Sequence, residues 1–207
     1  SYCEARSRLP ERLIEELAGK VARRLEARVP PEDLWFGRKV RLADGTCFSM
    51  PDTPGLLEAF GLPPNTKQGV GFPDARAVGL VSWSSGVVVG AAIGAYRTHE
   101  RHLFRETWGC LDPTDVVVTD AGFGSYAEIA LLKAQEADVV SRLRGRRSVD
   151  FRRGKRLGPG DHLVTWTRPA APPDWLPKDI ELPETLTLRE IRFTVQEPGY
   201  RSREIVQ

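Results

Sequence analysis

Sulfur-containing residues are scarce in this 207-residue chain, which has three cysteines and a single methionine, Met50. The cysteines (Cys3, Cys47 and Cys110) are odd in number and far apart, so the sequence indicates neither a disulfide framework nor a metal-binding pair. We therefore expect reduced thiols and a cytoplasmic protein. Because the chain begins at Ser1 and its methionine is internal, we also expect either a piece of a gene product or one that has lost its initiator residue.

Long apolar runs are also missing. No stretch approaches the roughly 20 apolar residues that a membrane-spanning helix needs, and residues 1–30 are charged throughout, unlike a signal peptide. The formal net charge is only +2, so a nucleic-acid partner has to be argued from local clusters of charge. The length suits one domain with an appendage. These absences predict a soluble protein with no membrane partner.

The first half of the chain predicts a mixed α/β order. Leu13, Leu17, Val21 and Leu25 recur every four residues, which predicts a helix over 10–28 that packs on the domain. The predicted elements that follow are a half-buried strand over 39–44, a loop over 50–76 with a short helix, a β-hairpin from 78–83 and 87–93, a helix over 98–110, a buried strand over 115–120, a helix over 126–134 and a strand over 138–143.

The last part of the chain predicts only strands and loops. Residues 161–167 have the pattern of a strand, residues 168–183 are rich in proline, and residues 200–206 predict a final strand. The alternation over 185–195 slips by one position, which predicts a β-bulge near Arg189 and Glu190. We expect three parts: a helical lead-in over 1–32, a core over 33–148 and a β-rich unit over 149–207.

Two aspartates stand at the ends of predicted strands. Asp120 follows the strand over 115–120, and Ser125 with Glu128 already forms a capping box for the next helix, so Asp120 has no obvious capping role. Asp44 ends the strand over 39–44. The alternatives are a turn aspartate that accepts a backbone N–H bond and, for Asp44-Gly45, a hairpin turn.

A common metal site is the functional interpretation of the same residues. If the two strands are parallel neighbours, Asp44 and Asp120 lie at one edge of the sheet, about 4.8 Å apart in strand spacing. Carboxylates that close repel each other unless a cation lies between them, and hard divalent ions favour oxygen ligands. Two such ions can assist cleavage of a phosphodiester.

A basic cluster follows the second aspartate. Arginine and lysine contact DNA phosphates without reading sequence, and the alternative is a solvated surface loop. The cluster contains Arg142, Arg144, Arg146, Arg147, Arg152, Arg153, Lys155 and Arg156.

Several motifs, in order, resemble the bacterial insertion-sequence DDE transposases, in the cut-and-paste group with a β-rich insertion before the last catalytic acid. The motifs are Leu42-Ala-Asp-Gly-Thr, Ser49-Met-Pro-Asp-Thr-Pro, Gly71-Phe-Pro, Thr119-Asp-Ala-Gly-Phe-Gly-Ser-Tyr and Asp150-Phe-Arg-Arg-Gly-Lys-Arg-Leu-Gly-Pro-Gly-Asp-His. The resemblance implies a ribonuclease H-like mixed sheet flanked by helices, with a partial β-rich insertion. It also implies binding of double-stranded DNA at transposon ends, cleavage and strand transfer with Mg²⁺ or Mn²⁺, and a homodimer in the complete enzyme.

The resemblance also assigns the site residues. The first two catalytic acids of the family fall on Asp44 and Asp120, as catalytic residues and metal ligands. The family usually has an arginine where this chain has Ala121. The catalytic glutamate belongs to a tyrosine–x2–arginine–x3–glutamate–x6–lysine signature, and after Tyr200 and Arg203 the glutamate position is Gln207. We therefore expect no third catalytic acid in this chain, and a fragment or decayed copy that is inactive alone.

Two other functions compete with this one. The first is a non-enzymatic DNA-binding remnant. The second is an NADP-binding α/β protein, because Gly122-Phe-Gly-Ser-Tyr-Ala fits a dinucleotide-binding turn between a strand and a helix. Arg142 could then serve a 2′-phosphate, whereas the carboxylate of Asp120 would repel a pyrophosphate.

Overall fold

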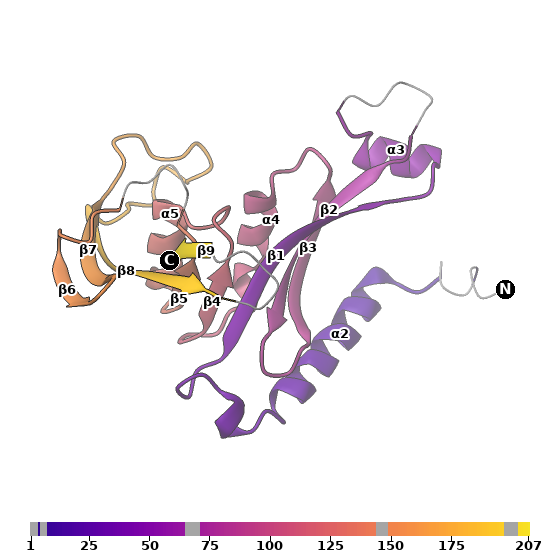
Figure 1. Cartoon of the computed structure of the whole chain (residues 1–207). Coiled ribbons are helices and arrows are strands. Elements are labelled where there is room, and N and C mark those ends of the chain that lie inside the picture. Colours follow the sequence, from indigo (N-terminus) through magenta and orange to yellow (C-terminus); the bar gives the residue numbers. More distant parts are fainter. Residues whose placement is uncertain (1–3, 5–7, 65–70, 144–148, 197–202) are drawn as a thin grey trace. The chain divides into compact units, whose positions relative to one another are not determined.

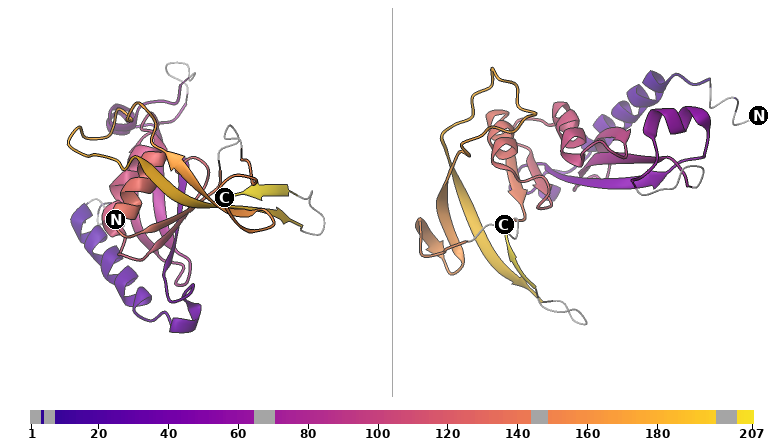
Figure 2. Two further views of the ribbon diagram at one scale, coloured as in Figure 1. Left: turned by 90° about the vertical axis from the view of Figure 1, so that its left-hand side faces the viewer. Right: turned by 90° about the horizontal axis from the view of Figure 1, so that it is seen from above.

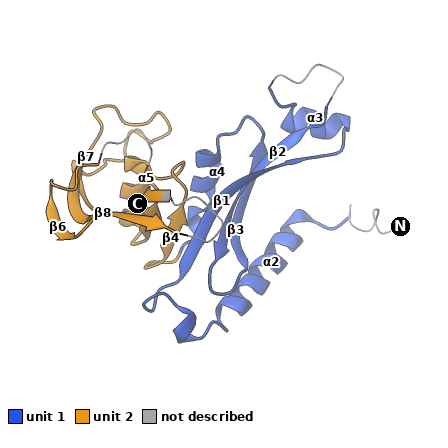
Figure 3. Cartoon of the chain, viewed as in Figure 1, with its two compact units in different colours: residues 1–111 blue, residues 112–207 orange. Residues whose placement is uncertain are grey.

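The computed structural model describes residues 4, 8–64, 71–143, 149–196 and 203–207. The chain divides into two compact units, residues 1–111 and 112–207 (Figure 3). The predicted boundaries after residues 32 and 148 stay predictions about domains. No described helix is long and apolar enough to cross a membrane.

The first unit is built on an antiparallel sheet of β1 (Val40–Ser49), β2 (Asp74–Ser82) and β3 (Val88–Ala95) (Figure 1). The predicted hairpin is confirmed: β2 and β3 pair antiparallel, and Gly86 turns between them with a φ of 68°. The predicted short helix in the long connection is α3 (Pro54–Phe60), which Thr53 caps. The connection therefore leads back into the sheet as β2, directly beside β1.

Helix α4 (Glu100–Glu106) continues as a 3₁₀ turn (Thr107–Cys110), so the predicted helix over 98–110 is confirmed with a change of helix type. Leu103 and Phe104 are fully buried, as are Val78 and Leu80 of β2. Closely packed aliphatic and aromatic side chains of this kind supply most of the stability of a small unit. The core of the first unit therefore lies between α4 and the sheet.

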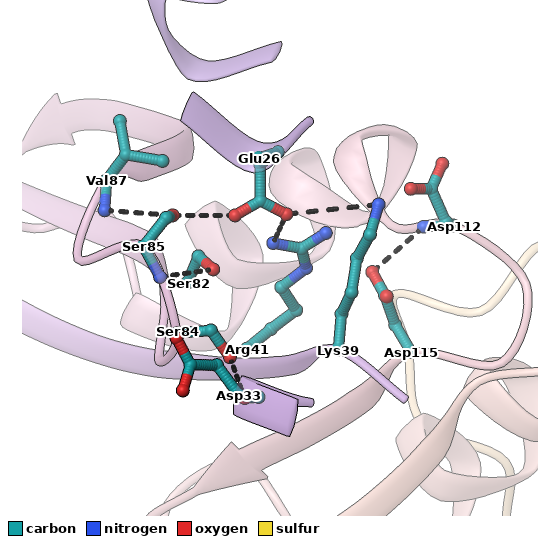
Figure 4. A network of polar contacts seen from close by, with 10 residues as sticks. All are labelled: Glu26, Asp33, Lys39, Arg41, Ser82, Ser84, Ser85, Val87, Asp112 and Asp115. Atoms are coloured by element: carbon teal, nitrogen blue, oxygen red, sulfur yellow. Dashed lines mark hydrogen bonds and ion pairs between the residues drawn. The ribbon is translucent and has the colours of Figure 1, made fainter. Parts of the chain in front are cut away.

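Helix α2 (Glu11–Glu26) is anchored to the sheet by its last residue. Glu26 accepts a bond of 2.7 Å from buried Arg41 and one of 2.6 Å from Ser85 (Figure 4). Burial raises the pKa of Glu26, but hydrogen bonds from Ser82, Ser85 and Arg41 outweigh it and hold the pKa below its ordinary value. The helix is present as predicted, but of its residues only Ala22 is buried, and its apolar stripe is exposed.

The second unit begins with a parallel β–α–β segment. β4 (Val116–Thr119) and β5 (Asp138–Ser141) pair in parallel, and α5 (Tyr126–Ala134) connects them. Parallel neighbours require such a crossover connection. Val116 and Val117 of β4 are fully buried, as a short β-branched run predicts.

The β-rich part forms an antiparallel sheet in the order β6 (Lys155–Gly158), β7 (Asp161–Thr167), β8 (Thr185–Val195) and β9 (Arg203–Val206) (Figure 2). It packs on α5 in one apolar cluster, where Trp166, Leu182 and Leu186 meet Tyr126 and Ile129. The hydroxyl of Tyr126 also donates to the carbonyl of Pro183 at 2.7 Å.

The predicted bulge near Arg189 and Glu190 is wrong. β8 pairs with β7 in unbroken register from Thr185 to Ile191, and β9 takes over from Arg192. The apolar alternation slips in the sequence without a bulge because the inward position is taken by a charged residue, Glu190, which is buried.

Glu190 is buried because two partners from β7 satisfy its carboxylate. It lies 2.9 Å from Nε2 of His162 and accepts a 2.9 Å bond from Nε1 of Trp166. Burial lowers the pKa of His162, but its bonds to Glu190 and to the carbonyl of Arg153 outweigh burial, so the pKa of His162 is raised above its ordinary value of 6.5. Protonated His162 therefore pairs with Glu190 inside the sheet.

This pair predicts a pH-dependent stability. The stabilisation is complete below pH 6.5, where the unfolded histidine is also protonated, and it is lost as pH rises through the raised pKa of folded His162. We expect the melting temperature, followed by circular dichroism, to fall over that range. In Glu190→Gln the melting temperature should be lower at acid pH and the fall should flatten.

Asp161→Asn is the matched control. It breaks an exposed ion pair with Arg189 between the same two strands, at 2.7 Å. The pKa of Asp161 is lowered by the hydrogen bond from Arg189, so its effect belongs to acid pH, and the fall above pH 6.5 should be kept. An unchanged slope in Glu190→Gln would contradict the assignment.

Candidate active site

The turn after β4 holds Asp120 in a fixed conformation. Asp120 follows the last residue of the strand, and its Oδ1 accepts the N–H of Gly122 at 2.7 Å. Its carbonyl accepts the hydroxyl of Ser141 from β5 at 3.0 Å. The turn interpretation of this aspartate is therefore part of the structure, and the residue is also exposed to solvent. The two interpretations are compatible because a carboxylate has a second oxygen.

The glycines of this turn allow close approaches. A Cβ atom on Gly124 would overlap Oγ of Ser141, and one on Gly122 would lie 2.8 Å from Oδ1 of Asp120. Both separations are far below van der Waals contact, so a side chain at either position would displace the turn. Sequence reasoning missed Ser141, because no local pattern connects it to a turn so much earlier in the chain.

The predicted capping box of α5 is confirmed. The backbone N–H of Glu128 donates to Oγ of Ser125, and the Glu128 carboxylate accepts the N–H of Ser125 at 3.3 Å and its hydroxyl at 2.7 Å. Glu128 is fully buried. The cap is thus complete without Asp120, as expected.

Asp44 lies inside a strand and not at its end. β1 extends past it to Ser49, and Asp44 pairs with Gly79 of antiparallel β2, so the predicted strand end at residue 44 and the hairpin alternative are both wrong. Its Oδ1 accepts the N–H of Gly45 at 2.8 Å. Opposite Asp44, Gly79 has no side chain, and a Cβ built there meets nothing within 4 Å. The exposed carboxylate of Asp44 therefore has open space beside it.

Gly45 explains why β1 contains an aspartate–glycine pair. A Cβ on Gly45 would lie 3.0 Å from the carboxyl carbon of Glu100 at the start of α4. The Glu100 carboxylate in turn lies 3.6 Å from Nε of Arg76 on β2. The glycine thus provides room for α4 to approach the sheet, while Asp44 projects from the neighbouring position of the strand.

The donor set fits a hard divalent cation but is incomplete. Neither Asp44 nor Asp120 forms an ion pair within the described chain, and each uses one oxygen to accept a backbone N–H. Among the described residues no three histidine, cysteine, aspartate or glutamate side chains gather as a metal cluster. The two aspartates belong to different compact units. Their common edge stays a prediction.

The basic cluster lies in the second unit. Arg144, Arg146 and Arg147 fall outside the described residues, whereas the other five cations are exposed. Asp150 is the acid among them: the hydrogen bond from the Arg152 side chain lowers the pKa of Asp150 to about 2, so it stays ionised. The exposed cations without this neutralising partner are Arg142, Lys155 and Arg156, the last two on β6.

The turn offers little to a dinucleotide. A phosphate-binding turn presents its backbone N–H groups to the ligand, but the N–H of Gly122 is donated to Asp120. The adjacent carboxylate would also repel a pyrophosphate. The geometry therefore favours the carboxylate-based interpretation of this turn over the NADP-binding alternative.

Comparison with known families decides between them. Residues 35–189 match the family model described as "Transposase DDE domain", which covers most of the chain and both aspartates. The chain belongs to the DDE transposase family. The match confirms the resemblance drawn from the sequence motifs.

Two curated relatives of this DDE family member come from Escherichia coli strain K12. The chain is 26% identical over 176 residues to the transposase InsG for insertion sequence element IS4, covering 83% of the chain and 39% of InsG. It is 28% identical over 130 residues to the putative transposase InsZ, covering 62% of the chain and 43% of InsZ. The chain thus spans about two fifths of the length of these relatives.

Among solved structures, a cryo-EM structure of the piggyBac transposase synaptic complex with hairpin DNA aligns with a TM-score of 0.37 at 12% identity. The alignment covers 64% of this chain and 31% of that one. Similarity at this level supports no detailed comparison. The observed α/β fold agrees with the predicted class.

The close approach at Gly124 predicts a specific defect. In Gly124→Ala the new methyl group meets Ser141, and overpacking of this kind destabilises by about 1–3 kcal/mol. We expect the second unit to unfold at lower urea concentration, and Ser141→Gly in the same chain to recover part of the stability. Gly79→Ala, which adds a methyl group in open space, is the control and should change stability little. Equal effects of the two alanines would contradict the assigned role.

Proposed function

We propose that this chain is the part of a DDE transposase that carries the first two catalytic acids, Asp44 and Asp120. The observation that supports this most strongly is that the family match includes both acids, and that both carboxylates are exposed with no cation partner among the described residues. In this proposal the two residues meet at one edge of the sheet and hold Mg²⁺ or Mn²⁺. The reaction class is cleavage and strand transfer of DNA at transposon ends, in the cytoplasm.

The protein residues have separable tasks. The backbone bonds from Gly45 and Gly122 fix the orientation of each carboxylate and occupy one oxygen, which leaves the other for a ligand. Bound divalent ions would activate the attacking oxygen and stabilise the leaving oxygen. In the proposal no third acid is supplied by this chain, which is inactive alone.

The exposed cations of the basic cluster serve the DNA. Lys155 and Arg156 are consecutive on β6, and Arg142 follows β5. Their charges would contact phosphates in any sequence, which accounts for affinity but not for recognition of transposon ends. A non-enzymatic DNA-binding remnant would share this property, so only the metal site distinguishes the two functions.

Metal binding tests the proposal directly. Mn²⁺ bound by the 207-residue chain can be followed by electron paramagnetic resonance, and Asp44→Asn and Asp120→Asn should each weaken it by at least about tenfold, because even outer-shell partners of a metal contribute that much. Asparagine keeps the oxygen that accepts the backbone N–H, so both folds should survive. Asp52→Asn, an exposed aspartate outside the site, is the control. Unchanged affinity in both site variants would leave only the remnant function.

DNA binding should be salt-dependent and sequence-independent. Fluorescence anisotropy with a random duplex should give a logarithmic salt slope that falls by about 2 in Lys155→Ala/Arg156→Ala, about one unit for each phosphate that is no longer neutralised. The double variant Lys133→Ala/Lys178→Ala removes the same charge from exposed positions of the same unit. If both pairs lower the slope equally, the basic cluster is not a specific DNA surface.

A further inference from the structure

An apolar stripe of α2 faces solvent. Its five members are between 39% and 54% exposed: Leu13, Ile14, Leu17, Val21 and Leu25. The only buried residue of the helix is Ala22. A contiguous apolar surface of this kind on a folded protein marks an interaction site more often than chance exposure does.

The stripe is presented by a fixed helix. Glu26 at its last turn is bonded to Arg41 at 2.7 Å and to Ser85 at 2.6 Å, with Lys39 at 3.9 Å (Figure 4). These contacts tie the helix to β1 and to the β2–β3 turn of the same unit. The stripe therefore needs no ordering before it meets a partner, which lowers the entropic cost of association.

Charge along the border of the stripe identifies the partner. The residues three positions after three of the stripe members form the neighbouring row of the helix surface, and in this row acidic Glu16 is followed by basic Lys20 and Arg24. The whole helix repeats the pattern, with Glu11 and Glu15 near its start. The row is thus acidic at one end and basic at the other, with its midpoint near the middle of the stripe.

We propose that a second copy of this chain covers the stripe, with the two α2 helices antiparallel. A two-fold axis near residue 19 would place Leu13 against Leu25 of the partner subunit and Leu17 against Val21 of the partner subunit. The same axis brings Glu16 beside Lys20 and Arg24 of the partner subunit. A parallel pair would instead place like charges side by side.

The helix pair forms a small interface. Two helices of 16 residues bury an area at the low end of stable protein interfaces, so the association is weak and depends on concentration. It requires neither DNA nor metal. Its failure is therefore distinguishable from failure of the proposed transposase function.

Sedimentation velocity of the 207-residue chain over a wide concentration range tests the proposal. We expect a reversible monomer–dimer equilibrium that Leu17→Asp/Val21→Asp abolishes. Glu16→Lys and Arg24→Glu should each weaken it by about tenfold, since each replaces two symmetric attractions with repulsions. The double variant Glu16→Lys/Arg24→Glu reverses the charge pattern within one chain, so its dimer should recover.

All of these positions are exposed, so the monomer should keep its fold, which circular dichroism checks. Ile93→Asp, on an exposed position of β3 outside the helix, is the control and should leave the dimer intact. The proposal is overturned if the chain is monomeric at every concentration, if the dimer survives Leu17→Asp/Val21→Asp, or if the charge-reversed double variant is weaker than both single variants. Recovery in that double variant is expected only for the antiparallel arrangement.

Discussion

One hydrogen bond, from the N–H of Gly122 to Oδ1 of Asp120, determines how the second unit is assembled. It closes the turn that leaves β4 and directs the chain into α5. Ser141 fastens the same turn to β5, and α5 then supplies the surface on which the β-rich sheet packs. A change in this turn is therefore transmitted to the packing of both strands and helix. The residue assigned to chemistry is also the residue that orders its own surroundings.

Carboxylates in this chain follow a common rule: each is placed where backbone or side-chain donors satisfy at least one oxygen. Buried Glu190 has both oxygens occupied, by His162 and Trp166, and acts as part of the core. Asp44 and Asp120 have one oxygen occupied and remain at the surface. Full satisfaction is what a buried charge requires. Partial satisfaction at the surface is what an oriented ligand requires.

The sequence predicted local features well and tertiary ones poorly. The strand before Asp120 and the Ser125 cap depend on neighbouring residues, and both were found. The bulge was wrongly expected in β8 because nothing near Glu190 in the sequence reveals its partners on β7. Asp44 was placed at a strand end because Asp-Gly usually ends a strand, whereas here Gly45 provides room for Glu100 of a later helix. In each failure the deciding interaction lies far along the chain, where periodicity carries no information.

The bare position opposite Asp44 has a consequence for ion capture. With Gly79 beside it, the carboxylate keeps its hydration shell, and attraction between opposite charges in water is only about one twentieth of that in a dry interior. An ion held there by Asp44 alone would exchange rapidly with solvent. Retention improves when a bulky polyanion lies over the glycine and displaces that water, so occupancy of the surface by nucleic acid and residence of the ion become thermodynamically linked.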